Sequence, residues 1–236
     1  MVSYPTFDSN TVSENWAELN SDDENSPLLN RATQGLYPPG STFKIITAAS
    51  ALEVSTKYMD FNFKCTGDAK FGDSILHCYD GKAHGKVDMT SAFAKSCNGY
   101  FATVAEEIGN DQLIKTATDF GFNTDLNFPL EYKKASFALK SNSDVKELAA
   151  TAIGQGKTLT SPLFMAMVTS AIANNGSIMQ PYIVDHIETP SGGVRNRTLP
   201  TKLLQACDSS TAHKIADMMC EVVRSGTATN ASFSVS

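Results

Sequence analysis

The sequence predicts one domain of the α+β class, in which helices lie beside short strands. Hydrophobic residues make up 42% of the 236 residues and charged residues 19%, which suits a folded domain with a sizeable core. Apolar residues recur at helical spacing in several segments, and shorter strand-like runs lie between them. No internal repeat or low-complexity linker divides the chain, so a single domain is the simplest interpretation.

The first forty residues are expected to be mostly loop, because they are rich in Asn, Ser, Asp and Pro. The opening segment 1–5 is interpreted as the end of a strand. Pro38-Pro39-Gly40 then stops this region and prepares a helix start at Ser41. Apolar residues at helical spacing continue from there to Leu52, which predicts a largely buried helix.

The remaining segments alternate between irregular and helical patterns. The Gly-, Asp- and Lys-rich segment 57–88 is expected to be loop with short strands, and 122–148 to be irregular. Ser161-Pro162 favours a helix start and Asn174-Asn175-Gly176 a helix end. The segments predicted to be helical are 89–95, one starting near residue 98, 111–120, 163–173 and 209–223, and 182–187 is predicted to be a strand.

The charge and hydropathy exclude two functional classes for this chain. The formal net charge is −6, so no basic stripe is available for a nucleic-acid backbone, and no nucleic-acid partner is expected. The longest apolar stretches, 45–52 and 162–173, are shorter than the roughly 20 residues that a membrane-spanning helix needs. No basic and then apolar run of a signal peptide follows Met1.

Five cysteines are spread widely along the chain and include no C-x-x-C pair, so neither a zinc ribbon nor a thioredoxin-type site is indicated. Cys65 and Cys78 bracket a loop, with His77 and His84 close in sequence. Three interpretations stay open, in decreasing order of preference: ordinary unpaired thiols, a disulfide, and a metal site. No metal or cofactor is predicted to be required.

Ser41 and Lys44 form the first candidate catalytic pair. Residues three positions apart on a helix share a face, so the hydroxyl and the amine can touch. A serine hydroxyl is a poor nucleophile until a neighbour takes its proton, and a lysine can do so if burial lowers its pKa. The apolar residues around Lys44 favour such burial, and the helix N-terminus offers amide donors for a developing oxyanion. The alternative is that S-x-x-K arises here by chance.

The residues around Ser41 and Lys44 match the motifs of a known protein family. Tyr37-Pro-Pro-Gly-Ser-Thr-Phe-Lys44 resembles the acylation motif of penicillin-binding proteins, and Lys95-Ser-Cys-Asn-Gly-Tyr-Phe101 resembles their S-x-N loop. The resemblance implies that Ser41 is the nucleophile and Lys44 its base. It also implies that Ser96 relays protons and that Asn98 hydrogen-bonds the substrate backbone. Helix capping is the alternative role of Ser96 and Asn98, and both roles can hold together.

A third segment, Gly154-Gln155-Gly156 followed by Ser161-Pro162-Leu-Phe-Met-Ala, is similar to the Gly-Gln-Gly segment of high-molecular-weight transpeptidases. By that resemblance Gly154, Gln155 and Gly156 bind substrate. Thr151 stands where a phosphate-binding P-loop needs glycine, and Leu159 interrupts a Lys-Thr-Gly reading.

The family also has a Lys-Thr-Gly element on a strand beside the site, and this chain offers no clear counterpart. Arg224-Ser-Gly-Thr227 is rejected, because the residues before it have helical spacing whereas the motif belongs on a strand. We therefore expect residues 1–236 to be a fragment of a penicillin-binding transpeptidase domain, incomplete at both ends and ending before that strand. We expect the fragment alone to be slow or inactive, since one lost oxyanion donor costs about 100- to 1000-fold in rate.

The resemblance implies a fold of the serine β-lactamase/transpeptidase type, with an antiparallel sheet flanked by helices. It implies a D,D-transpeptidase that cross-links peptidoglycan stem peptides through an acyl-enzyme on Ser41 and that is acylated by β-lactam antibiotics. Expected partners are cell-wall synthesis or division proteins, at the extracytoplasmic face of a bacterial membrane, through an anchor that this chain lacks. The alternatives are a β-lactamase or β-lactam sensor of the same fold, or a non-catalytic cell-wall scaffold domain.

Overall fold

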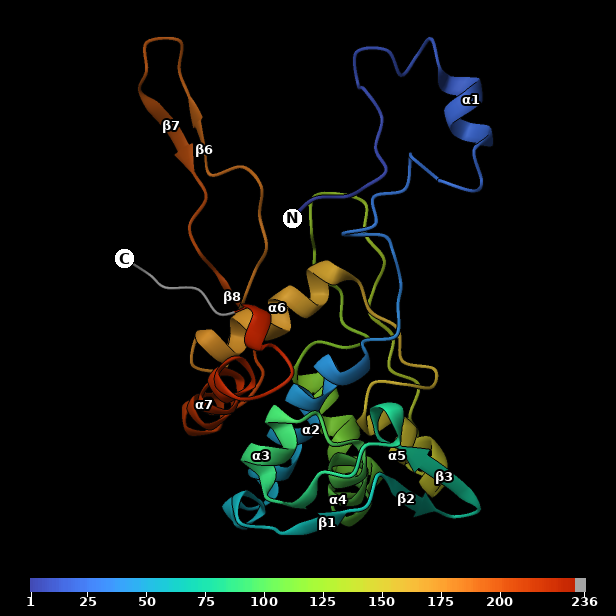
Figure 1. Ribbon diagram of the computed structural model, residues 1–236. Helices are drawn as coiled ribbons and strands as arrows, with labels where there is room; N and C mark the ends of the chain where they lie inside the picture. The colour runs from blue at the N-terminus through green and yellow to red at the C-terminus, as the bar shows by residue number, and fades with distance from the viewer. Residues whose placement is uncertain (232–236) are drawn as a thin grey trace.

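A computed structural model describes residues 1–231 of the chain; the last five residues lie outside the described part. Helices dominate it (Figure 1). The α-helices are α1 (Trp16–Ser21), α2 (Lys44–Val54), α3 (Met89–Ala94), α4 (Asn98–Asp119), α5 (Val145–Ala152), α6 (Pro162–Ala173) and α7 (Ser209–Arg224). Short 3₁₀ turns are η1 (Gly40–Phe43), η2 (Thr56–Met59), η3 (Tyr79–Gly81) and η4 (Thr229–Ala231). No helix among residues 1–231 combines the length and apolar character needed to cross a membrane.

Within residues 1–231 the strands pair antiparallel, as predicted, and form four separate two-stranded sheets. The pairs are β1 (Phe63–Cys65) with β4 (Gly85–Val87), β2 (Asp68–Phe71) with β3 (Ser74–His77), β5 (Ser177–Met179) with β8 (Lys202–Gln205), and β6 (His186–Glu188) with β7 (Val194–Arg197). Each strand is only three or four residues long, so the helices provide most of the core.

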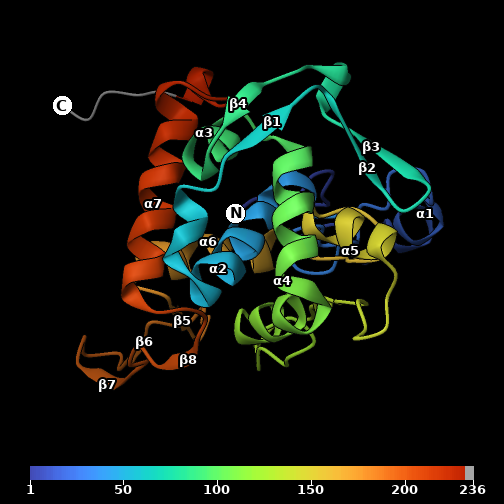
Figure 2. The same ribbon diagram turned by 90° about the horizontal axis from the view of Figure 1, so that it is seen from below.

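Helix α2 is the centre of the molecule. It lies between α7 and α4 when the molecule is seen from below (Figure 2), and it packs against both. Every residue from Lys44 to Leu52 is buried, and apart from Lys44, Thr47 and Ser50 these residues are apolar. Below its first turn, Phe43 contacts Phe122 and Phe137 with ring centroids 5.7 and 5.8 Å apart. This aromatic cluster supports the turn that carries Ser41.

The helix starts follow the local sequence. Ser161 caps α6 by accepting from the Phe164 N–H, and Pro162 occupies the first helical position, as predicted. Asp88 and Ser91 form a reciprocal capping box on α3. Gly109 leaves the helical region inside α4 (φ 79°, ψ 170°), so the later part of α4 corresponds to the separate helix predicted at 111–120. Helices α3 and α7 also lie where the sequence placed them.

Other local predictions were wrong. No strand forms in residues 1–5, which have no pairing partner among the described strands. The segment 122–148 is not irregular throughout, because Asp144 caps the start of α5. The strand predicted at 182–187 forms later, as β6, and β7 is its one partner among the described strands. These segments lack a strong local period, so tertiary contacts decide their conformation.

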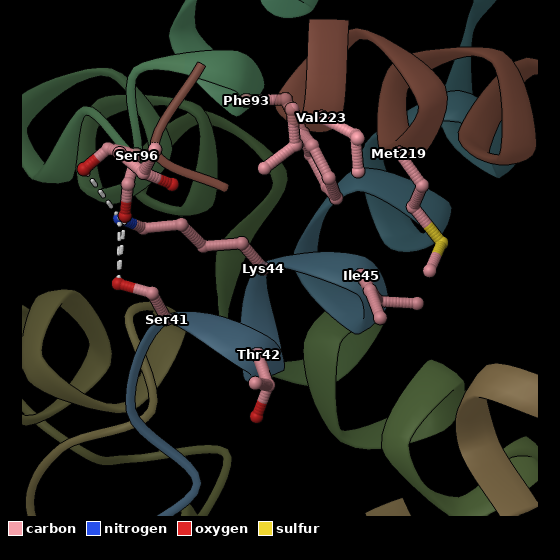
Figure 3. A pocket seen from close by; sticks show the side chains of 10 residues that line it. Ser41, Thr42, Lys44, Ile45, Phe93, Ser96, Met219 and Val223 are labelled. Atoms are coloured by element: carbon pink, nitrogen blue, oxygen red, sulfur yellow. Dashed lines mark hydrogen bonds between the residues drawn. The ribbon is translucent and has the colours of Figure 1, made fainter. Parts of the chain in front are cut away.

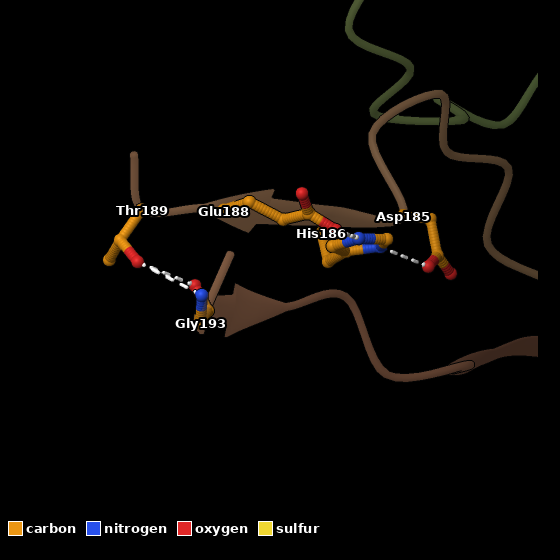
Figure 4. A network of polar contacts seen from close by, with 5 residues as sticks. All are labelled: Asp185, His186, Glu188, Thr189 and Gly193. Atoms are coloured by element: carbon orange, nitrogen blue, oxygen red, sulfur yellow. Dashed lines mark hydrogen bonds and ion pairs between the residues drawn. The ribbon is translucent and has the colours of Figure 1, made fainter. Parts of the chain in front are cut away.

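Two extensions project from the helical body on the same side (Figure 1): the N-terminal segment with α1, and the β6–β7 hairpin. In the hairpin, the His186 ring contacts the carboxylates of Asp185 and Glu188 at 2.7 and 2.8 Å (Figure 4). Hydrogen bonds to Asp185 and then to Glu188 raise the pKa of His186. These contacts are solvent-exposed and therefore contribute little to the stability of the domain.

Replacing Phe122 with alanine should destabilise the domain, because its ring is 1% exposed and contacts both Phe43 and Phe164. A loss of about 3–5 kcal/mol in the free energy of unfolding is expected for such a truncation. Urea unfolding followed by circular dichroism measures it. Leu199→Ala is the control, since Leu199 is 73% exposed. Equal stability of the two variants would contradict this account of the core.

Candidate functional site

The turn that carries Ser41 is tighter than the sequence predicted. Residues Gly40–Phe43 form a 3₁₀ turn, and the α-helix begins only at Lys44. Side chains at positions i and i+3 eclipse one another in a 3₁₀ turn. The Ser41 hydroxyl and the Lys44 amine therefore lie on one side, with Nζ 3.3 Å from Oγ.

Ser96 reaches the same point from the end of α3. Its φ of 55° is left-handed, a conformation that usually belongs to glycine just after a helix. This turn directs both of its oxygens at Lys44, whose Nζ donates to the Ser96 carbonyl at 2.7 Å and to Oγ at 2.9 Å. The Ser96 hydroxyl in turn donates to Ser41 Oγ at 2.8 Å. Backbone strain at such a residue is typical of functional sites.

Asn98 completes the cluster from the first residue of α4. Its Oδ1 accepts from Lys44 Nζ at 2.7 Å, and its Nδ2 donates to the His77 carbonyl at 2.8 Å. The residue that caps α4 is Cys97, and no side-chain hydrogen bond is made at that cap. The side chains of Ser96 and Asn98 therefore do not cap α4. Both side chains contact Lys44 instead.

The environment of Lys44 lowers the pKa of its amine toward neutral pH. Its side chain is 2% exposed, and burial lowers its pKa to about 8 although the Cys97 and Cys78 thiols act in the opposite direction. The Ser96 carbonyl and Asn98 Oδ1 can only accept hydrogen bonds. A neutral amine that donates its two N–H groups to them keeps a lone pair for the hydroxyls. The arrangement can therefore accept a proton from Ser41, directly or through Ser96.

Beside these groups lies an open cavity of about 310 Å³ (Figure 3). Ser41, Lys44 and Ser96 contribute polar groups to its lining, together with Thr42 and Thr227. Its apolar part comes from Ile45 on α2, Phe93 on α3, and Met219, Val222 and Val223 on α7. The candidate nucleophile Ser41, the candidate base Lys44 and the hydroxyl of Ser96 thus meet at the edge of a largely apolar cavity.

Gly154, Gln155 and Gly156 do not line this cavity. Gly154 instead supports the nucleophile turn from behind, where its carbonyl accepts from the Gly40 N–H at 2.8 Å. A Cβ on Gly154 would lie 2.0 Å from the Gly40 carbonyl oxygen. Gln155 and Gly156 are exposed. The structure brings Ser41, Lys44, Ser96 and Asn98 together and leaves the Gly-Gln-Gly segment as a neighbour of the turn.

Residues 224–227 do not lie on a strand, which agrees with the rejection of Arg224-Ser-Gly-Thr227 as the Lys-Thr-Gly element. Arg224 is the last residue of helix α7. The chain then turns back onto α3, where the Thr227 N–H donates to the Ala94 carbonyl at 3.1 Å. Thr227 nevertheless lines the cavity, as does Thr42. Sequence reasoning missed both residues, as well as the role of α7. The apolar face of α7 was visible in the sequence, but its period does not distinguish a core face from a cavity wall.

A second cavity, of about 540 Å³, shares Ser96 and Thr227 with the first. Lys82, His84 and Lys95 also line it. Burial, followed by the charges of Lys95 and Lys82, lowers the pKa of His84. Lys82 and Lys95 give the surface next to Ser96 a positive formal charge, although the whole chain is acidic.

The penicillin binding protein transpeptidase domain model matches residues 1–236. The chain therefore belongs to the penicillin-binding protein transpeptidase family. Peptidoglycan D,D-transpeptidase PbpA of Mycolicibacterium smegmatis is 33% identical over 93% of this chain and 47% of its own length. Stage V sporulation protein D of Bacillus subtilis is 32% identical over 98% of this chain and 35% of its own length. The chain spans about half, or less, of the length of these relatives.

Solved structures support the same assignment. The D,D-transpeptidase domain of a peptidoglycan glycosyltransferase from Eggerthella lenta superposes with a TM-score of 0.92 at 33% identity, over 99% of this chain and 60% of that one. The imipenem acyl-enzyme complex of penicillin-binding protein A from M. tuberculosis gives a TM-score of 0.86 at 30% identity, over 94% and 53%. The transpeptidase-type fold expected from the sequence is thus confirmed.

Gly154→Ala should displace the nucleophile turn, because the added methyl meets the Gly40 carbonyl and the φ of 73° is unfavourable for alanine. A stability loss of about 1–3 kcal/mol is expected from the strained conformation, and the clash adds to it. Thermal unfolding of the variant measures this loss.

Gly156→Ala is the matched control, since its φ of 79° carries the same strain while its nearest neighbours lie 3.9 Å away. The two variants therefore separate the clash from the backbone strain. An equal loss in both would show that the approach of Gly154 to Gly40 is not tight.

Proposed function

We propose that this chain carries the acylation centre of a serine-type peptidoglycan D,D-transpeptidase. The observation that carries the proposal is the position of Lys44: its buried amine touches the hydroxyls of both Ser41 and Ser96. With a pKa of about 8, roughly a tenth of these amines are neutral at pH 7 and able to act as a base.

In the acylation step, Ser41 Oγ attacks the carbonyl carbon of the penultimate D-Ala of a stem peptide. Its proton passes to Lys44 Nζ, either directly over 3.3 Å or through Ser96 Oγ. The new C–O bond forms as the C–N bond to the terminal D-Ala breaks. The leaving amine takes the proton back from Lys44 through Ser96, and D-Ala departs. Asn98 holds Lys44 in place, and its hydrogen bond to the substrate backbone is proposed from the family resemblance.

The second step transfers the acyl group. The amine of another stem peptide attacks the ester carbonyl, its proton passes to the Lys44–Ser96 pair, and Ser41 leaves as a restored hydroxyl. Atoms and protons balance within these residues and the two peptides. A β-lactam acylates Ser41 by the same first step, with ring opening in place of departure of D-Ala.

The names of the related proteins support this proposal. PbpA of M. smegmatis and MrdA of Acinetobacter baumannii are peptidoglycan D,D-transpeptidases, and penicillin-binding protein A from M. tuberculosis forms acyl-enzymes with imipenem and penicillin G. Gly154, Gln155 and Gly156 stay in the proposal as substrate-binding candidates next to the turn. A cell-wall role implies partners among synthesis or division proteins and a place outside the bacterial membrane.

The two alternatives fit the site less well. Rapid hydrolysis of a β-lactam needs a base for the deacylating water, and no acidic residue is found among the described residues that line either cavity next to Ser96. A scaffold domain would not need a buried lysine with four polar contacts, because such burial costs stability. Transpeptidation is therefore preferred.

Labelled penicillin should form a stable adduct on Ser41 in the longest natural protein that contains this chain. Intact-mass and peptide mass spectrometry locate the adduct. Ser41→Ala should abolish it, whereas Ser191→Ala should not, because Ser191 is exposed in the distant β6–β7 hairpin. Absence of an adduct on Ser41 would overturn the proposal, and release within seconds would favour the β-lactamase alternative.

The acylation rate should rise with pH and level off above a midpoint near 8, because the reactive form of Lys44 is the neutral amine. Each pH unit below the midpoint should lower the rate constant about tenfold. Stopped-flow measurement with a chromogenic β-lactam between pH 6 and 9 gives the profile. A rate that is constant over this range would exclude Lys44 as the base.

A further inference from the structure

A compact group of thiols and one imidazole lies just behind the acylation centre. The ligand atoms of Cys65, Cys78, His84 and Cys97 all lie within 4.8 Å of one another. The three cysteines are buried and His84 is half-buried. Cys65 ends β1, Cys78 follows β3, His84 precedes β4, and Cys97 caps α4. Four separate parts of the fold thus converge on one point, which ordinary packing does not require.

We propose that these four residues bind one Zn²⁺ ion in a Cys₃His site. In a tetrahedral zinc site, metal–sulfur bonds of about 2.3 Å place neighbouring sulfurs about 3.8 Å apart, and sulfur and nitrogen about 3.5 Å apart. The structure has 3.7 Å between the sulfurs of Cys65 and Cys78, and 4.0 Å between those of Cys78 and Cys97. Cys65 Sγ lies 3.4 Å from His84 Nδ1. Thiolates with one imidazole favour zinc over Mg²⁺ or Ca²⁺.

A disulfide explains the group less well. Bonded sulfurs lie about 2.05 Å apart, and neither close pair approaches that distance. Cys78 is also shared between two partners, so any single disulfide would leave one thiol and His84 without a role. A tetrahedral ion uses all four groups at their present spacing.

The backbone around the group is built tightly. The Cys78 N–H donates to the Gly67 carbonyl at 2.7 Å, and Gly67 approaches the Gly81 carbonyl so closely that a Cβ would lie 2.2 Å from it. Strands β1 to β4 are too short to hold this region by pairing alone. A metal that cross-links β1, the 78–84 turn and α4 would supply the missing stability.

The location gives the ion a consequence for the proposed active site. Cys97 separates Ser96 from Asn98, and Cys78 follows His77, whose carbonyl accepts from Asn98. The same ion therefore ties together both segments that position the hydrogen-bond acceptors of Lys44. We assign it a structural role, since all four coordination positions are filled by protein and none is left for a substrate.

The test is metal analysis of the chain purified under reducing conditions without chelators. About one zinc per chain is expected by inductively coupled plasma mass spectrometry. Cys65→Ser and His84→Ala should each lose most of this zinc. Cys207→Ser and Cys220→Ser are the matched controls and should keep it, because neither residue belongs to the group. Zinc retained by the first pair, or lost equally by the second, would overturn the site.

A measurement on the unaltered chain guards against variants that fail to fold. Metal-free chain titrated with Co²⁺ should develop the d–d absorption typical of tetrahedral thiolate ligation, with an endpoint at about one equivalent, and Zn²⁺ should displace it. A chain that binds neither Co²⁺ nor Zn²⁺ would refute the proposal. This holds both when intact-mass measurement shows free thiols and when it shows a disulfide. Penicillin labelling of Ser41 is scored separately, so loss of the metal site and failure of the proposed activity give different results.

Discussion

The burial of one amine, that of Lys44, is the constraint on which the rest of the site depends. A charged amine is costly to bury without partners, and four polar contacts from Ser41, Ser96 and Asn98 satisfy this one. Burial lowers the pKa of Lys44 to about 8, which is the property that a general base needs near neutral pH. The same contacts fix the positions of the Ser41 and Ser96 hydroxyls.

Two features of the backbone serve this arrangement at some cost in stability. Ser96 adopts a left-handed conformation that favours glycine, and so turns its carbonyl and hydroxyl toward Lys44. Gly154 approaches Gly40 more closely than any residue with a side chain allows, and so holds the nucleophile turn in place. The apolar core around Phe43 and Phe122 compensates, because it packs directly beneath that turn.

The segment between β1 and α4 differs from the turn that carries Ser41, which has the aromatic cluster of Phe43, Phe122 and Phe137 beneath it. Its strands are short and much of its surface is exposed, yet it supplies the His77 carbonyl that orients Asn98. A zinc ion on Cys65, Cys78, His84 and Cys97 would give this segment a fixed geometry without a larger core. The thiol group and the acylation centre would then be two parts of one structural unit.

The sequence by itself determined the family, the four candidate catalytic residues and the helices with clear caps, because those depend on local motifs such as Pro-Gly-Ser-x-x-Lys and Ser161-Pro162. Only the tertiary structure decided the role of Gly154, the cavity wall from α7 and the meeting of Cys65, Cys78, His84 and Cys97. These features join residues that are distant in sequence, and a local period or motif carries no information about such contacts. The spacing of the cysteines left three interpretations open, and the convergence of their sulfurs on His84 now favours the metal site.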